Sequence, residues 1–169
     1  TIIGTSVTVI APTGEYTSDK LINLGTNRWS IKPELAITQR IGNRWMMDLY
    51  TGVWLFTDND SFYPGSSERK QDPLYSFQGH LSYNINTRTW AAFNATYYVG
   101  GQSAINDIYK DDQQSNSRIG VTLSFPVAKR NSVKVAYSQG AIIRTGADFK
   151  TVSLGWNYTW FDKKSRIQK

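Results

Sequence analysis

The stretch from Lys150 to Phe161, KTVSLGWNYTWF, alternates residue by residue between two kinds of side chain. Successive side chains of a β-strand point to opposite faces, so one face of this segment is apolar and aromatic while the other is small and polar. The apolar face holds Val152, Leu154, Trp156, Tyr158 and Trp160. The pattern predicts a strand with one face turned away from water, either towards the core of a soluble sheet or towards the lipid around a transmembrane β-barrel.

Seven earlier segments show the same alternation, each bounded by Gly, Pro, Asn or charged residues that favour turns and loops. These segments are Ile2–Ala11, Trp29–Ile41, Trp45–Thr57, Leu74–Ile85, Thr89–Gly100, Arg118–Val127 and Ser132–Ile142. Together with Lys150–Phe161 they predict an all-β, antiparallel chain of eight strands.

The connections between these segments alternate between long and short. The long ones read as exposed loops and are Thr13–Arg28, Asp58–Gln71, Gly101–Asn116 and a loop around Arg144–Asp148. The short ones are tight turns at Gly42-Asn43, Asn86-Thr87-Arg88 and Lys129-Arg130-Asn131. All long loops therefore fall at one end of the sheet. Outer-membrane barrels have this asymmetry, with long extracellular loops and with short turns and both termini in the periplasm.

Composition favours a transmembrane barrel. Aromatic residues make up 14% of the 169 residues while the mean hydropathy is only −0.44, and no apolar run approaches the roughly 18 residues of a membrane helix. The alternative is a soluble barrel of the lipocalin or avidin type, whose apolar face points inward. The polar face of such a barrel would carry many Lys and Glu, whereas here it is rich in Gly, Ser, Thr, Asn and Ala. We therefore predict a transmembrane β-barrel over residues 1–161 and a cationic periplasmic tail over residues 162–169.

Aromatic residues gather near both ends of the predicted strands, where amphipathic rings suit the membrane interfaces. The predicted interface aromatics are Trp29, Trp45, Tyr75, Tyr83, Trp90, Tyr97, Trp156, Trp160 and Phe161. They predict two belts, one at each surface of the bilayer.

Charge and cysteine content exclude several classes of function. The formal net charge is +6, but four basic residues lie in the tail and the others are scattered, so no basic stripe for nucleic acid is present. The chain has no cysteine, which removes disulfide and thiolate chemistry. No signal peptide is visible, and residue 1 is Thr, as expected for a mature or truncated form.

The polar face predicts the lining of a lumen. The candidate lining residues are Lys32, Glu34, Asp48, Tyr50, Gln78, His80, Asn94, Arg118, Lys134 and Asn157. Charges inside a barrel must be paired, so one interpretation is an ion-pair network that fills the interior. The other is a lining that selects among solutes.

Candidate catalytic and metal-binding groups are few. His80 is the single histidine, and Ser76, Ser82 and Glu34 are predicted on its face, as in outer-membrane lipid hydrolases. Those enzymes act at the lipid-facing surface, so we predict hydrogen-bonded filler and no catalytic residues. The loop acids Asp58, Asp60, Asp107, Asp111 and Asp112 match no calcium-loop spacing and are interpreted as solvated. No metal or cofactor is expected.

Two resemblances add to these predictions. The Ser153-x-Gly155-x-x-Tyr158-x-Trp160-Phe161 segment resembles the C-terminal signal read by the barrel assembly machinery. Pro12-Thr13-Gly14-x-Tyr16, followed by Asn23-Leu24-Gly25-x-Asn27-Arg28-Trp29, resembles the outer-membrane family named for the MetA pathway of phenol degradation. Its members are described as transporters of aromatic or other hydrophobic compounds. The resemblance implies passive passage of such solutes, with outer-membrane lipid and lipopolysaccharide as surroundings. A non-conducting structural or surface-binding barrel is the alternative, and a lipid hydrolase is a third.

The number of strands in the complete barrel stays open. The resemblance implies further strands before Pro12, in a barrel of about twelve strands. Alternatively the eight strands close on themselves, with Thr5–Ile10 paired to Val152–Tyr158. An eight-stranded barrel would be filled by side chains such as Trp54 and Tyr98, whereas a larger barrel would leave a path.

Overall fold

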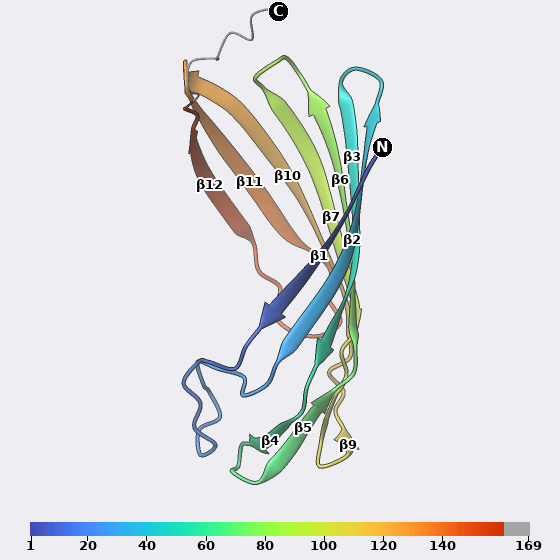
Figure 1. The fold of residues 1–169 in the computed structure, drawn as a ribbon, viewed down its shortest axis with the longest axis vertical. Coiled ribbons are helices and arrows are strands. Elements are labelled where there is room, and N and C mark those ends of the chain that lie inside the picture. Colours follow the sequence, from blue (N-terminus) through green and yellow to red (C-terminus); the bar gives the residue numbers. More distant parts are fainter. Residues whose placement is uncertain (161–169) are drawn as a thin grey trace, which may run out of the picture.

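The computed structural model describes residues 1–160, all of whose regular elements are β-strands. Eight long strands form one antiparallel sheet in the order β1-β2-β3-β6-β7-β10-β11-β12 (Figure 1). Their bounds are β1 (Ile2–Ile10), β2 (Ser30–Ile41), β3 (Trp45–Phe56), β6 (Leu74–Asn84), β7 (Trp90–Gly100), β10 (Gln114–Ala128), β11 (Asn131–Ile142) and β12 (Thr151–Tyr158). No helix among the described residues is long and apolar enough to cross a membrane.

The eight predicted strands are confirmed, because each has a counterpart in this sheet with ends shifted by only a few residues. Each strand pairs with its neighbour along the chain, as in a meander. The turn at Gly42-Asn43 is tight, with Gly42 at a φ of 60°, a conformation that favours glycine. The strand ends at the three short turns lie together with the start of β1, and the long connections lie at the opposite end (Figure 1). We call these the short-turn end and the long-loop end.

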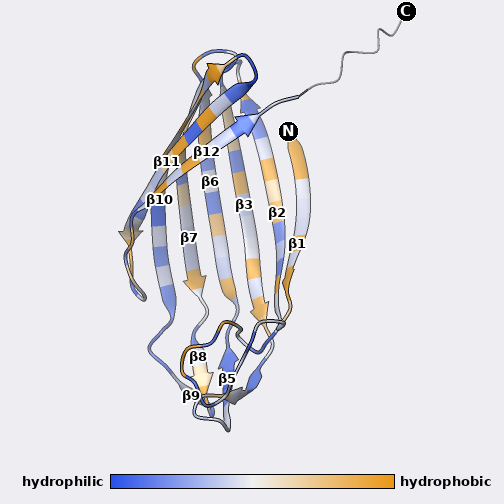
Figure 2. Ribbon diagram, turned by 90° about the vertical axis from the view of Figure 1, so that its left-hand side faces the viewer, coloured by the Kyte–Doolittle hydropathy of each residue, from blue (hydrophilic) through white to orange (hydrophobic). Residues whose placement is uncertain are grey.

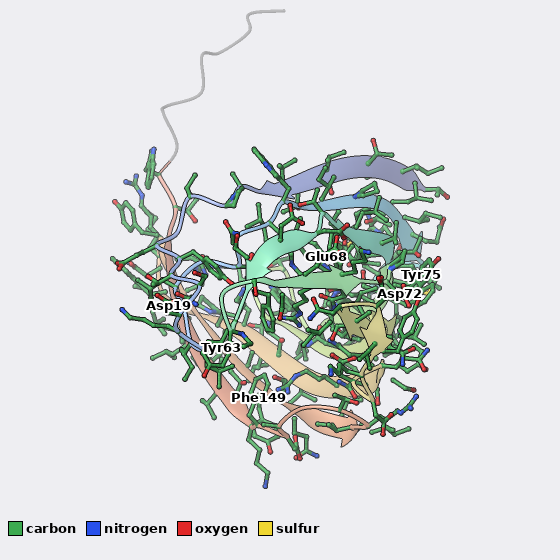
Figure 3. All side chains as sticks on the ribbon, turned by 90° about the horizontal axis from the view of Figure 1, so that it is seen from below. Asp19, Tyr63, Glu68, Asp72, Tyr75 and Phe149 are labelled. Carbon is green, nitrogen blue, oxygen red and sulfur yellow. The ribbon has the colours of Figure 1, made fainter. Side chains whose placement is uncertain are left out.

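The sheet is an open arc. In the described part of the chain β1 pairs only with β2, and β12 pairs only with β11. Figure 3, seen from the long-loop end, shows the arc with its two edges apart. The alternative in which Thr5–Ile10 pairs with Val152–Tyr158 is therefore not what this structure adopts. Two unpaired edges, each a row of free N–H and C=O groups, remain available to further strands.

The two faces of the sheet differ in chemistry as predicted. Apolar residues on one face are exposed, Leu49 to 45% and Val121 to 55%, and Leu35, Leu81 and Leu154 share this face. Small polar residues on the other face are buried, among them Ser76 at 1% and Ser124 at 6%. In a soluble protein the apolar face of a sheet is buried and the polar face is exposed, so the distribution here is reversed. Figure 2 shows the resulting alternation of hydropathy along each strand.

The second and third long connections are not irregular loops, which corrects the prediction. They form a second, four-stranded sheet in the order β4-β5-β8-β9 at the long-loop end. Its strands are β4 (Asn59–Phe62), β5 (Ser67–Gln71), β8 (Ser103–Ile105) and β9 (Ile108–Tyr109). The turn between β8 and β9 places Asn106 and Asp107 at φ of 49° and 62°, which is the conformation of a type I′ hairpin turn. Strands β4 and β5 are mostly polar, and β8 and β9 are only three and two residues long, so no alternation marks them.

The structure places most of the predicted interface aromatics on the exposed apolar face, with one exception. Trp90 pairs with Asn84 and Ser124, which puts it on the polar face, so it is not an interface aromatic of the apolar face. Trp90 does lie near the end of its strand, as predicted, but its side chain points to the polar face of the sheet. Phe161 and the tail 162–169 lie outside the described residues. Trp29, Trp45, Tyr75, Tyr97, Trp156 and Trp160 are exposed, and the Trp45 and Tyr83 rings are 4.7 Å apart between centroids.

Candidate functional site

The strand register brings most of the predicted lining residues into neighbouring rows on the polar face. One row runs Ala36, Tyr50, Gln78, Thr96 and Arg118, each the direct partner of the next. The adjacent row runs Thr38, Asp48, His80 and Asn94. Cross-strand partners lie about 4.5–5.5 Å apart, so side chains within a row can touch. The two rows cross the middle of the sheet.

The charged pair Lys32 and Glu34 sits towards the long-loop end of this face. The two side chains form an ion pair and are only 12% and 19% exposed. The ammonium of Lys32 also lies 5.7 Å from the centre of the Trp54 ring, a cation–π contact. The pairing satisfies both buried charges, as the polar-face interpretation requires.

Side chains in the middle of the polar face form hydrogen bonds with one another in two groups. Thr38 donates to Asp48 at 2.6 Å, and the Nδ1 atom of His80 lies 2.7 Å from the Oδ1 atom of Asn94. Asn94 in turn donates to Thr122 at 3.0 Å. The ring of Tyr50 meets His80 edge-on, with centroids 5.6 Å apart. These contacts hold the polar side chains in fixed positions.

The remaining predicted lining residues are spread along β10, β11 and β12. Arg118 donates to Ser138 at 3.3 Å and to the carbonyl of Phe149 at 3.0 Å, and its guanidinium lies 4.0 Å from the Phe149 ring centre. Lys134 lies opposite Gly155, and Asn157 lies opposite Ser132, both on the polar face. Lys134 and Asn157 are exposed, since they lie near the open edge at β12.

The groups considered for hydrolysis do not assemble. His80 is bonded to Asn94, and the hydroxyl of Ser76 donates to the carbonyl of Gly52 at 3.3 Å. The carboxylate of Glu34 forms an ion pair with Lys32. In the described residues the three side chains therefore point to separate partners.

Two hollows lie on the apolar face. One is lined by residues such as Leu49, Phe77 and Ile119, and the second by residues such as Leu81, Phe93 and Val121. In the first, the hollow runs past Gly79 and Ala95, which are cross-strand partners with small side chains. Both hollows form where small side chains lie between larger ones on the apolar face, which is opposite to the face that carries the polar rows.

Comparison with known proteins identifies the family. The family model described as "Putative MetA-pathway of phenol degradation" matches residues 2–141, most of the chain. The chain belongs to this family. Among solved structures, it is similar to the crystal structure of the COG4313 outer membrane channel from Pseudomonas putida F1, with a TM-score of 0.80 and 27% sequence identity. The match covers 92% of this chain and 58% of that channel, so the chain spans a little over half of its relative's length. No curated protein matches.

These findings confirm the predicted family and the antiparallel barrel fold, and they place the chain in the outer membrane. The structural relative is described as a channel rather than as an enzyme.

The residues that carry the family resemblance meet at the long-loop end. Gly14 and Gly25 approach so closely that a Cβ on Gly25 would lie 2.6 Å from the carbonyl oxygen of Gly14. Asn23 closes the segment between them: its side chain accepts from the amide of Thr17 at 2.8 Å and donates to the carbonyl of Lys20 at 2.8 Å. A larger residue at either position would clash with the backbone of the other, so both must be glycine. These contacts give the long first loop a defined conformation.

Asn59 joins this loop to the second sheet. It is 2% exposed and donates to the Tyr16 hydroxyl at 3.0 Å and to the Thr26 carbonyl at 3.2 Å. Its Oδ1 atom accepts from Asn27 at 2.9 Å and from the amide of Ser61 at 3.0 Å. We use the name loop-end cap for residues 13–28 together with β4 and β5.

The loop acids are partly engaged. Glu68 and Asp107 bond Lys70 at 2.9 and 3.0 Å and hold the pKa of its ammonium above the usual range. Asp111 pairs with Arg144 at 3.3 Å. These pairs are exposed, so each contributes little to stability.

Sequence reasoning missed the cap. Asn59, Arg69 and Gln71 lie in a segment whose composition predicts an exposed loop. The partners of Asn59 in the first loop, and those of the Gln71 side chain, lie 30 or more residues away in the chain. The family motif itself was the available signal, because Tyr16, Asn27 and Arg28 are the residues through which the first loop contacts the second sheet.

Proposed function

We propose that this chain is part of the wall of an outer-membrane channel for passive passage of small hydrophobic or aromatic solutes, with no covalent chemistry. The observation that carries the proposal is the polar face of the sheet. Its charged side chains are few: Lys32 and Glu34 form an ion pair, and the middle rows carry Asp48 and Arg118 among uncharged residues. A lining of this kind strongly excludes neither neutral solutes nor small ions.

Additional strands complete the barrel in this proposal. An unpaired strand edge in lipid would leave backbone groups without hydrogen bonds at several kcal/mol each, so β1 and β12 need partners in the membrane. The eight strands observed here, with the longer structural relative, favour a barrel larger than eight strands. Such a barrel leaves a passage that side chains do not fill.

Orientation and assembly follow the general pattern of such barrels. The loop-end cap faces the outside of the cell and the short turns face the periplasm, as in bacterial outer-membrane barrels generally. Recognition of Ser153–Phe161 by the assembly machinery stays a prediction.

Two measurements on the full-length protein test this function. Conductance in planar bilayers tests for an open path, and uptake of a labelled neutral aromatic compound into proteoliposomes tests for the solute class. We expect both, with uptake saturating weakly or not at all and needing no energy source. If neither is seen, the non-conducting structural barrel becomes the better account. Conductance without aromatic uptake would reject the solute class alone.

A further inference from the structure

Two arginines lie near each other in the loop-end cap. Arg28 immediately precedes Trp29 and β2, and Arg69 lies in the middle of β5. Burial and the neighbouring positive charge of Arg69 lower the pKa of Arg28 to about 10, an effect that Asp58 opposes. This pKa is still far above neutral, so Arg28 keeps its charge beside the guanidinium of Arg69. Two like charges held together in a partly buried place normally require a nearby anion.

The two guanidinium groups keep unused donors. Arg28 donates through Nη2 to the neutral Gln71 at 2.5 Å, but its Nη1 atom is buried without a hydrogen-bond partner among the described residues. The Nε atom of Arg69 is likewise buried and unpartnered within residues 1–160. Neither arginine has an ion pair in this part of the chain. Buried N–H groups without acceptors are rare in folded proteins and call for a bound partner.

Each of the two guanidinium groups makes a cation–π contact with an aromatic ring. The Arg28 guanidinium lies 4.4 Å from the centre of the Phe56 ring, and that of Arg69 lies 5.2 Å from the centre of the Phe62 ring. Stacking on a ring occupies the face of a guanidinium and leaves its edge, which bears the N–H groups, free to bind a planar anion. A carboxylate accepts two such bonds side by side.

Both arginines line one cavity. It has a volume of about 280 Å³, and its wall includes Lys20 and the apolar side chains Leu21, Ile22 and Phe62. This is just below the range of about 300–1,000 Å³ typical of drug-sized ligands, so it suits a smaller molecule with one ring. The cavity thus combines cations with an apolar wall.

We propose that Arg28 and Arg69, assisted by Lys20, bind the carboxylate of a small aromatic acid at the long-loop end, with the ring against Phe62 and Leu21. The acid accepts hydrogen bonds from the two guanidinium groups where they line the cavity, and its negative charge offsets the two positive ones. The site deepens the proposed channel function, on which its biological use rests, by giving the mouth of the passage a preference for aromatic acids.

Binding is tested without a membrane, so its outcome is independent of conductance. Benzoate is titrated into the full-length protein in detergent micelles, followed by calorimetry, with benzyl alcohol as the same ring without the carboxylate. We expect benzoate to bind in preference to benzyl alcohol. Arg28→Gln and Arg69→Gln should each weaken benzoate binding about tenfold or more, because each removes a charged donor pair. Arg144→Gln, in a different loop, is the matched control and should leave binding unchanged.

Three results would overturn the site. These are the absence of benzoate binding by the wild type, equal losses in the Arg144→Gln control, and unchanged binding in both Arg28→Gln and Arg69→Gln. Inorganic phosphate is the second probe, since a phosphate of lipopolysaccharide offers the same charge. Binding of phosphate but not of benzoate would reject the aromatic acid and indicate a lipid phosphate instead. Heat-dependent migration in gels checks that each variant is folded, and Phe62→Leu, which should weaken benzoate while sparing phosphate, gives a second test of the ring contact.

Discussion

Asn59 shows how a single residue shapes the long-loop end. It uses both atoms of its amide to connect the first loop with the second sheet, through Tyr16, Thr26, Asn27 and Ser61. An aliphatic residue at this position would leave several buried donors and acceptors unpaired. The cap that carries Arg28 therefore depends on one amide side chain.

Substitution of this residue gives the first prediction. We expect Asn59→Ala to lower the free energy of opening of the first loop by about 2 kcal/mol, since each buried group left unpaired costs about 1–3 kcal/mol. Amide hydrogens of residues 13–28 should then exchange about 30-fold faster. The measurement is hydrogen exchange with mass spectrometry on the full-length protein. Asn43→Ala, at an exposed turn of the opposite end, should leave exchange in residues 13–28 unchanged, and equal acceleration in both variants would contradict this role of Asn59.

At the scale of strands, the apolar band is nearly as tall as the lipid-facing band of outer-membrane barrels. Tyr75 and Tyr83 in β6 are separated by eight residues on the same face, about 26 Å along the strand. Tilt shortens this to about 20 Å, close to the apolar band of about 25 Å in outer-membrane barrels. Leu49 lies opposite Gly79, midway between these tyrosines, and so faces the centre of the membrane.

The second prediction uses this depth. Leu49→Lys should lower the free energy of unfolding in lipid by about 2–4 kcal/mol, because a charged side chain at the bilayer midplane is costly. Gln78→Lys is the matched control one residue before Gly79, on the polar face, and should change stability by less than about 1 kcal/mol. Urea unfolding of the full-length protein in vesicles measures both. Equal losses in the two variants would contradict the assignment of the faces.

The same strands explain how far sequence reasoning could go. Leu49, Leu81 and Val121 alternate with small polar residues because lipid and a polar interior impose opposite demands, and this two-sided constraint made the eight strands visible in the sequence. Strands β4 and β5 are mostly polar and β8 and β9 are very short, so only their turn chemistry could have marked them, such as Asn106 and Asp107 at positive φ. The arginine site was hidden for a different reason. Arg28 and Arg69 come from segments 41 residues apart, and only the folded cap brings their charges together.

At the scale of the whole molecule, the sheet has two free edges. The third prediction tests them in the full-length protein, into which cysteines can be placed without background because the chain has none. The pair Val7→Cys and Trp156→Cys, on β1 and β12, should not form a disulfide, since the two strands are not neighbours. Val9→Cys with Ile31→Cys is the control, because these residues are direct partners in β1 and β2 and cross-strand Cα distances suit a disulfide. Efficient bridging of the first pair, seen by gel shift under oxidation, would mean that the eight strands close on themselves.

The central claim is that the polar face lines a water-filled passage while the apolar face meets lipid. Thr96 lies on the polar face between Gln78 and Arg118, and Thr51 lies on the apolar face between Leu35 and Phe77. Each is replaced by cysteine in the full-length protein, and single-channel conductance is recorded before and after a charged, membrane-impermeant methanethiosulfonate reagent is added. The account predicts that the reagent lowers the conductance of Thr96→Cys and leaves Thr51→Cys unchanged. Block of Thr51→Cys with no effect on Thr96→Cys would contradict it.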